Sequence, residues 1–82
     1  MVNKVLIVLL SSTSAFSLKT LMEKRFGVHS TVIQAPAQLA QLGCSYCLEI
    51  DISDMKTAVN IIKASGITTR GIYDGETYQK IY

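Results

Sequence analysis

Six consecutive apolar residues, Val5 to Leu10, constrain the fold of this 82-residue chain more than any other feature. A strand with one face in water alternates apolar and polar side chains, whereas a continuous apolar run indicates a strand covered on both faces. The run follows Lys4 and precedes Ser11 to Ala15, an order that imitates a secretory signal peptide. Because it is shorter than the ~7–15 apolar residues of a signal, we interpret it as the central strand of a single domain, residues 1–82.

The residues after this run predict a helix. All four residues from Ser11 to Ser14 carry hydroxyl groups, and such side chains are favourable at helix caps but unfavourable inside helices. Apolar side chains then recur at helical spacing, with Lys19, Glu23 and Lys24 on the other side, and Gly27 is expected to end the helix in a left-handed conformation. The apolar positions are Ala15, Leu18, Leu21, Met22 and Phe26.

The rest of the chain predicts four further strands and two further helices. Clusters of β-branched residues and alternating apolar positions indicate the strands, and the dipeptide Asp74-Gly75 is typical of a hairpin turn. In chain order we expect a strand over Val28 to Ile33, a short helix over 35–42 with Pro36 in its first turn, a strand from Tyr46 to Ile50, a helix capped by Ser53 and closed by Gly66, a strand over Thr68 to Tyr73 and a strand over Thr77 to Tyr82.

This order of elements predicts the fold class. Strand, helix, strand, short helix, strand, helix and strand match the split βαβ plan. We therefore expect an α+β, ferredoxin-like sandwich in which two helices cover one face of an antiparallel sheet. A short extra helix precedes the third strand, and a C-terminal β-hairpin follows the fourth. Because this fold hosts many unrelated functions, it argues for none of them.

Charge and hydropathy exclude several classes of function. The net charge is +2 and the Lys and Arg residues are scattered singly, so the chain lacks an electrostatic footprint for nucleic acid or anionic lipid. The first and third strands also lack the stacking aromatics of RNA-binding sheets, Tyr46 being the single candidate. No apolar stretch approaches the ~18 residues needed to span a membrane. Charged residues make up 17% of the chain, below the roughly 25% of an average domain, which hints at a covering partner such as a second copy.

Two cysteines, Cys44 and Cys47, are the distinctive chemical groups. They are too few for a secreted disulfide scaffold and suit a reducing cytoplasm. If residues 44–47 were extended, the two Cα atoms would lie ~10 Å apart, beyond the roughly 7 Å that a disulfide tolerates. Together with His29 they make at most three ligands, against the four of a structural zinc site. We therefore expect neither a metal nor a cofactor.

Position along the chain separates the two thiols. Cys47 falls in an alternating strand, and we interpret it as a small buried hydrophobe. Cys44 follows Gly43 in a loop, where backbone N–H groups outside any ladder can stabilise the nucleophilic thiolate; an inert loop thiol is the open alternative. The hydroxyl turn Ser11 to Ser14 has two interpretations as well. It either binds an anion at a helix N-terminus or only caps the helix, which we favour.

Several short motifs occur in the order seen in a known family. They are Leu10-Ser11-Ser12, Ala15 and Leu21 on the first helix, Ala35-Pro36, Leu39, Gly43-Cys44-Ser45-Tyr46 and Gly66 to Tyr73. Over about residues 5 to 73, the chain resembles the small bacterial family of selenium/sulfur carrier-like proteins, formerly a domain of unknown function. Ser45 stands where that family commonly has glycine, and Cys47 is additional.

The resemblance implies that Cys44 accepts sulfur or selenium as a persulfide or selenopersulfide and passes it to another protein. Cys47 is then a candidate resolving thiol, and the residues that we expect to surround the site are Ser11, Ser12, Thr13, Gly43 and Ser45. The implied partners are a cysteine desulfurase-type donor and an acceptor protein, and the protein is a carrier rather than an enzyme. The alternative is a small-molecule-binding or regulatory module without thiol chemistry, acting as a homodimer, which the low charge, the four tyrosines and the hydroxyl turn also suit.

Overall fold

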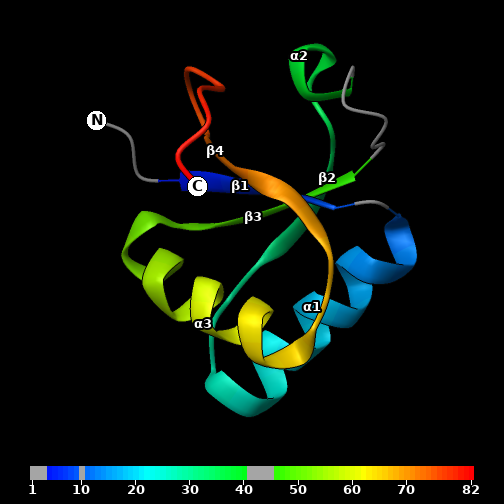
Figure 1. Ribbon diagram of the computed structural model, residues 1–82, viewed down its shortest axis with the longest axis vertical. Coiled ribbons are helices and arrows are strands. Elements are labelled where there is room, and N and C mark those ends of the chain that lie inside the picture. The colour runs from blue at the N-terminus through cyan, green and yellow to red at the C-terminus, as the bar shows by residue number, and fades with distance from the viewer. Residues whose placement is uncertain (1–3, 10, 41–45) are drawn as a thin grey trace.

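A computed structural model describes residues 4–9, 11–40 and 46–82 of the chain. Within these residues the chain forms four strands, three α-helices and one 3₁₀ turn (Figure 1). In chain order they are β1 (Lys4–Leu9), α1 (Ser12–Phe26), β2 (Thr31–Gln34), α2 (Ala37–Ala40), β3 (Tyr46–Asp51), the 3₁₀ turn η1 (Ile52–Asp54), α3 (Met55–Ser65) and β4 (Thr69–Asp74).

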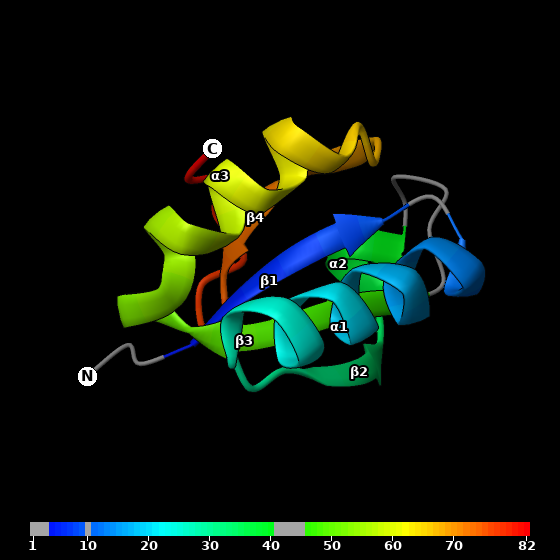
Figure 2. The ribbon, with the colours of Figure 1, turned by 90° about the horizontal axis from the view of Figure 1, so that it is seen from below.

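The four strands form one antiparallel sheet in the order β2-β3-β1-β4. β3 lies between β1 and β2, the two strands that α1 connects, and β1 lies between β3 and β4, the two strands that α3 connects. Both long helices contribute to one core on the same face of the sheet (Figure 1, Figure 2). This is the split βαβ arrangement, so the expected α+β, ferredoxin-like fold is confirmed, including the short helix before the third strand.

β1 is buried on both faces, as its continuous apolar run predicts. Val5, Ile7 and Leu9 face the two long helices, whereas Leu6 and Val8 face the opposite side, towards α2. We call the two clusters the helix-side core and the α2-side cluster. The helix-side core comprises Val5, Ile7, Leu9, Ala15, Leu18, Met22, Val28, Leu48, Ile50, Ala58, Ile61 and Ile72, and the α2-side cluster comprises Leu6, Val8, Leu39 and Cys47.

α1 begins and ends at the predicted residues. Ser11 is the N-cap in an extended conformation, and its Oγ accepts a hydrogen bond from the backbone N–H of Ser14 at 3.2 Å. Gly27 ends the helix with φ 66° and donates its N–H to the carbonyl oxygen of Met22. A left-handed conformation of this kind costs a residue with a Cβ roughly 1–2 kcal/mol, which explains glycine at this position.

Two element boundaries differ from the prediction. The N-cap position of α3 is Asp54 instead of Ser53, and the Asp54 side chain makes no capping hydrogen bond. Ser53 lies in η1, an exposed 3₁₀ turn before the helix; such turns are frequent at helix N-termini. β2 begins at Thr31 and not at Val28. The N–H of Val28 donates to the carbonyl of Met22 at 3.0 Å, and its side chain enters the helix-side core as the chain leaves α1.

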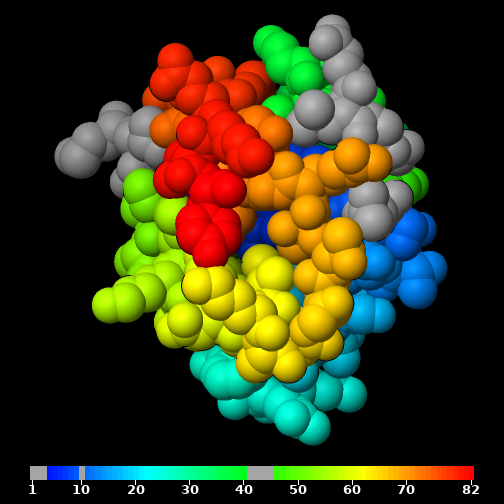
Figure 3. Space-filling model, viewed as in Figure 1, coloured from blue at the N-terminus to red at the C-terminus, as the bar shows by residue number. Residues whose placement is uncertain are grey.

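The C-terminal hairpin is shorter than predicted. The expected returning strand over Thr77 to Tyr82 is reduced to one bridge between Tyr73 and Lys80. The turn is also wider than a two-residue Asp-Gly turn, because Asp74 Oδ1 accepts backbone hydrogen bonds at 2.7 and 2.9 Å from the residues two and three positions further on. Figure 3 shows the last residues, in red, beside β4 in orange and α3 in yellow-green.

Candidate functional site

One end of the sheet gathers the segments that the sequence associates with function. β1 ends there at Leu9, two residues before the cap of α1 at Ser11. β3 begins at the same end, because the antiparallel register pairs Val8 with Cys47. β2 ends there too, since its last residue, Gln34, pairs with Tyr46. The antiparallel direction of β1 and β3 therefore brings the start of α1 and the start of β3 to one end, a point that the sequence leaves open.

The segment Gly43-Cys44-Ser45 lies outside the described residues. Its described neighbours are Ala40, the last residue of α2, and Tyr46, the first residue of β3. The residues expected to surround the thiol fall into two groups: the hydroxyl residues Ser11 to Thr13, which the structure describes, and the Gly43-Cys44-Ser45 segment, which it does not.

Cys47 is a core residue, as predicted. Its side chain is fully buried in the α2-side cluster beside Leu6, Val8 and Leu39. The next residue, Leu48, belongs to the helix-side core on the other face of the sheet, as the alternation of side chains along a strand requires. Cys47 thus packs as a small apolar side chain within the α2-side cluster.

The hydroxyl turn caps α1. Ser11 Oγ accepts from the N–H of Ser14, and Ser11 also offers its carbonyl oxygen to the N–H of Ala15 at 3.1 Å. Ser11 and Thr13 are exposed, and the first turn of the helix carries no acidic side chain. The capping interpretation is confirmed for Ser11. The positive end of the α1 dipole also lies at the sheet end where β3 begins.

The two carboxyl groups with lowered pKa values lie away from this sheet end. The Lys19 ammonium, one turn away on α1, donates to Glu23 and lowers the pKa of its carboxyl. The backbone N–H groups of Thr77 and Glu76 lower the pKa of Asp74, which pairs with Val5 at the start of β1, the opposite end of that strand. Both shifts belong to local structure and not to the candidate site.

Among the described residues, the histidine, cysteine and carboxylate side chains form no group of three or more that could hold a metal ion. His29 is exposed and lies two residues before Thr31, the first residue of β2. Thr31 pairs with Glu49 of β3. Cys47 pairs with Ile33, near the other end of β2. His29 and Cys47 are therefore about four strand residues apart, roughly 13 Å, and the fold does not bring them together.

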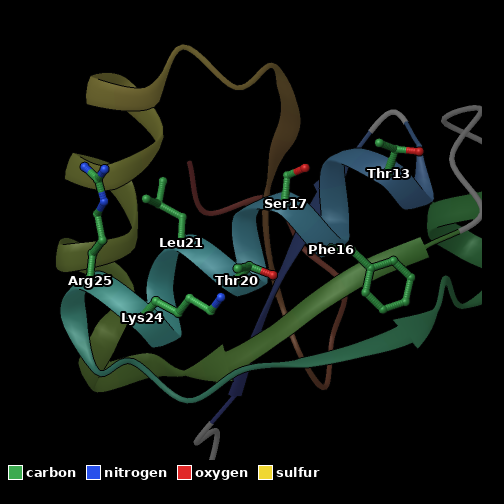
Figure 4. A pocket seen from close by; sticks show the side chains of 7 residues that line it. All are labelled: Thr13, Phe16, Ser17, Thr20, Leu21, Lys24 and Arg25. Atoms are coloured by element: carbon green, nitrogen blue, oxygen red, sulfur yellow. The ribbon is translucent and has the colours of Figure 1, made fainter.

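α1 also has an exposed hollow that the sequence reading does not identify. Figure 4 shows its lining side chains, all from α1: Thr13, Phe16, Ser17, Thr20, Leu21, Lys24 and Arg25. Leu21, at the edge of the hollow, also packs against the helix-side core. Phe16 is 56% exposed and Phe26, at the last residue of the helix, is 52% exposed. The assignment of Phe26 to the buried stripe is wrong, because it lies at the surface beside Ile61 and Ala64 of α3. The sequence does indicate that Phe16 is exposed, because helical spacing places it outside the buried stripe formed by Ala15, Leu18 and Met22.

In the part of the chain that the structure describes, no helix combines the length and the apolar character required to cross a bilayer.

The fold and the site define a class: a ferredoxin-like α+β domain in which β3, the strand that follows Cys44 in the chain, begins at the sheet end where α1 is capped. Comparison with protein families identifies that class more closely. The family model described as "Putative Se/S carrier protein-like" matches residues 4–74. The chain belongs to this family, in agreement with the resemblance found in the sequence. No curated protein and no solved structure matches the chain.

Proposed function

We propose that this protein carries sulfur or selenium on Cys44, as a persulfide or selenopersulfide, and passes it to a partner protein. The observation that carries the proposal is membership of the Se/S carrier-like family over residues 4–74, a range that includes Cys44. A carrier family implies interaction with partner proteins. In this proposal the donor is an enzyme of the cysteine desulfurase type, the acceptor is a second protein thiol, and both act in the cytoplasm, where thiols stay reduced.

The chemistry is a transfer without net oxidation. The Cys44 thiolate attacks the terminal sulfur of the donor's persulfide, a new S–S bond forms to Cys44 Sγ, the donor's S–S bond breaks, and the donor leaves as a thiolate. The acceptor thiolate then repeats the attack on the sulfur held by Cys44. With selenium as cargo, the same electron pairs move and a S–Se bond replaces the S–S bond. Each step requires a thiolate that the next protein can approach.

The described neighbours of Cys44 support this chemistry. Tyr46, two positions further on, begins β3 at the sheet end where Ser11 caps α1. The first turn of α1 contributes the positive end of its dipole there and no acidic side chain. A positive environment favours the thiolate and the anionic persulfide over their neutral forms.

Cys47 suits a structural role better than a resolving one. Its side chain is fully buried beneath α2, within the α2-side cluster. A resolving thiol must reach the sulfur on Cys44 and attack it, which a side chain fixed in a packed cluster can do only after local opening. We therefore expect Cys47→Ala to keep most of the capacity for sulfur uptake.

Intact mass spectrometry tests the proposal. The protein is incubated with a cysteine desulfurase and free cysteine, and the adduct of one sulfur atom is quantified on the wild type, Cys44→Ala and Cys47→Ala. We expect the adduct on the wild type and on Cys47→Ala, and its loss in Cys44→Ala. Alkylation followed by peptide mapping locates the sulfur.

Two results would contradict the proposal in different ways. If Cys44→Ala took up as much sulfur as the wild type, Cys44 would not be the acceptor thiol. Equal loss in Cys44→Ala and Cys47→Ala, with both variants folded, would make the two cysteines a functional pair and assign the resolving role to Cys47. A thermal-shift screen of amino acids and anions on Cys44→Ala separates the binding-module alternative, which does not need the thiol.

A further inference from the structure

We infer that the outer face of α1 is the docking surface for the sulfur donor, and that it fits an acidic protein surface with an apolar pocket for Phe16. The α1 outer face is the stripe that lines the hollow in Figure 4, from Thr13 to Arg25. The inference rests on the proposed function, because it names the partner surface that loads Cys44.

The apolar part of the argument is the exposure of Phe16. The inner side of α1 is occupied by Ala15, Leu18 and Met22, which are fully buried. Phe16 points away from that side and is 56% exposed, at the N-terminal end of the hollow (Figure 4). Phenylalanine and arginine are enriched at the centres of protein interfaces, and the hollow presents both.

The second part of the argument is that the net positive charge of the chain is concentrated on α1. α1 carries three basic residues and one acidic residue, whereas the rest of the chain carries five of each, so α1 accounts for the whole net charge of +2. Lys19 pairs with Glu23. This leaves Lys24 and Arg25, both exposed, at the other end of the hollow. Two adjacent cations attract an acidic surface and speed its encounter.

The position of the face links docking to transfer. It begins at Thr13, two residues after Ser11, at the sheet end where β3 starts and the Cys44 segment rejoins the described chain. From Thr13 to Arg25 it extends along the helix for about 18 Å, the reach of several side chains of a partner. A donor seated on this face would hold its own persulfide near that sheet end.

The same features argue for a protein partner over a polyanion. Lipid-binding and nucleic-acid-binding surfaces cluster about 4–8 basic side chains, whereas this face has two beside an aromatic ring and several hydroxyl groups. Protein interfaces combine an apolar centre with a polar rim. The face has that composition, with the exposed ring of Phe16 beside Thr13, Thr20 and Lys24.

Transfer rates from two donors test the inference. One donor is a cysteine desulfurase from the same organism, charged with free cysteine; the other is glutathione persulfide, which needs no docking surface. The variants are Lys24→Glu with Arg25→Glu, and Phe16→Ala. The matched controls are Lys56→Glu with Arg70→Glu, which makes the same charge change at exposed positions elsewhere, and Tyr82→Ala, which removes an equally exposed ring at the last residue of the chain, outside α1.

We expect the charge reversal to slow loading from the desulfurase by about tenfold or more at low salt, with the difference shrinking as salt screens the charges. Phe16→Ala slows it by about tenfold. Both controls change it by less than about twofold. All variants load from glutathione persulfide at the wild-type rate, and their unchanged melting temperatures show that they are folded.

Each contrary result has a distinct meaning. Wild-type rates in the charge-reversed and Phe16→Ala variants, or a wild type that is loaded by glutathione persulfide but not by the desulfurase, overturn the docking inference and leave Cys44 as the carrier. A wild type that takes up sulfur from neither donor overturns the proposed function and the docking inference together. A change of oligomeric state in the charge-reversed variant overturns the inference by assigning the face to a second copy of the chain.

Discussion

The two faces of the sheet are covered to very different depths. On one face, α1 and α3 enclose the helix-side core of twelve buried residues. On the other, among residues 4–9, 11–40 and 46–82, the four-residue helix α2 and the segment after β4 cover the four buried residues of the α2-side cluster. The same strand feeds both layers, with Val5, Ile7 and Leu9 on one side and Leu6 and Val8 on the other.

The difference predicts which face contributes most to the free energy of unfolding and which face tolerates substitutions better. In the chain, the candidate thiol segment follows α2 and precedes β3, two elements that contribute Leu39 and Cys47 to the α2-side cluster. Functional segments come from the parts of a protein that open at low free energy. We therefore expect the helix-side core to determine whether the chain folds, and the α2-side cluster to determine how firmly the ends of the thiol segment are held.

The largest effect is expected for Leu18→Ala in the helix-side core. Leu18 is fully buried on α1 against the sheet, and removal of such a side chain from an enclosed core costs about 4 kcal/mol. This is comparable with the whole stability of a small domain, roughly 4–12 kcal/mol at this length. Urea unfolding followed by circular dichroism measures the loss. The exposed Ser17→Ala on the same helix is the control, and a loss below about 2 kcal/mol would show that the core collapses around the cavity.

A smaller loss is expected for Leu39→Ala in the α2-side cluster. Leu39 is 2% exposed, but it projects from a helix of four residues that can settle into the space. We therefore expect about 2 kcal/mol, the low end for such a substitution, in the same urea experiment. Gln38→Ala, exposed on the same helix, is the control. The comparison of the two faces would break if Leu39→Ala cost as much as Leu18→Ala.

The smallest effect concerns the turn that follows β4. Hydrogen bonds from the N–H groups of Thr77 and Glu76 lower the pKa of Asp74 below its ordinary value of 3.8. A carboxyl whose pKa is lowered in the folded state adds stability above the ordinary value, and that stability is lost as the pH falls through the lowered pKa. The wild type should therefore lose more of its melting temperature than Asp74→Asn when the pH falls from neutral to below 3.8.

Differential scanning calorimetry across that pH range measures this difference. Glu23→Gln is a second test, since Glu23 also has a lowered pKa but lies on α1, and Glu76→Gln, at an exposed position in the same turn as Asp74, is the control. Parallel pH curves for the wild type and Asp74→Asn would mean that the turn contributes nothing to acid stability. If only Glu23→Gln differed from the wild type in the pH dependence of the melting temperature, the acid-sensitive contact would be the one between Glu23 and Lys19 on α1.

Local features of the fold could be predicted from the sequence because they depend on residues close together in the chain. Ser11 and Gly27 set the ends of α1 through hydrogen bonds that reach only three to five residues. The prediction of Ser53 as a cap is wrong for the same reason: two neighbouring residues, Ser53 and Asp54, both suit a cap, and the 3₁₀ turn after β3 selects the second. The exposure of Phe26 depends on where α3 lies, which helical spacing does not encode.

The candidate site divides in the same way. The sequence, with the family resemblance, singles out Cys44, and the apolar character of a cysteine within a strand predicts that Cys47 is buried, as it is. The proximity of Ser11 and Tyr46 could not be predicted, since it requires β1 and β3 to pair antiparallel. The hollow on α1 was missed because helical spacing places Phe16 outside the buried stripe but does not show which exposed side chains surround a hollow.

By itself, then, the sequence determined a central strand buried on both faces, the caps of α1 and the assignment of Cys47 to a strand. Only the tertiary structure decided the strand order β2-β3-β1-β4, the unequal covering of the two faces and the meeting of β3 with the start of α1. The physical reason is range. Capping and side-chain alternation act over a few residues, whereas strand pairing joins residues 12 to 69 positions apart, from Gln34 with Tyr46 to Val5 with Asp74.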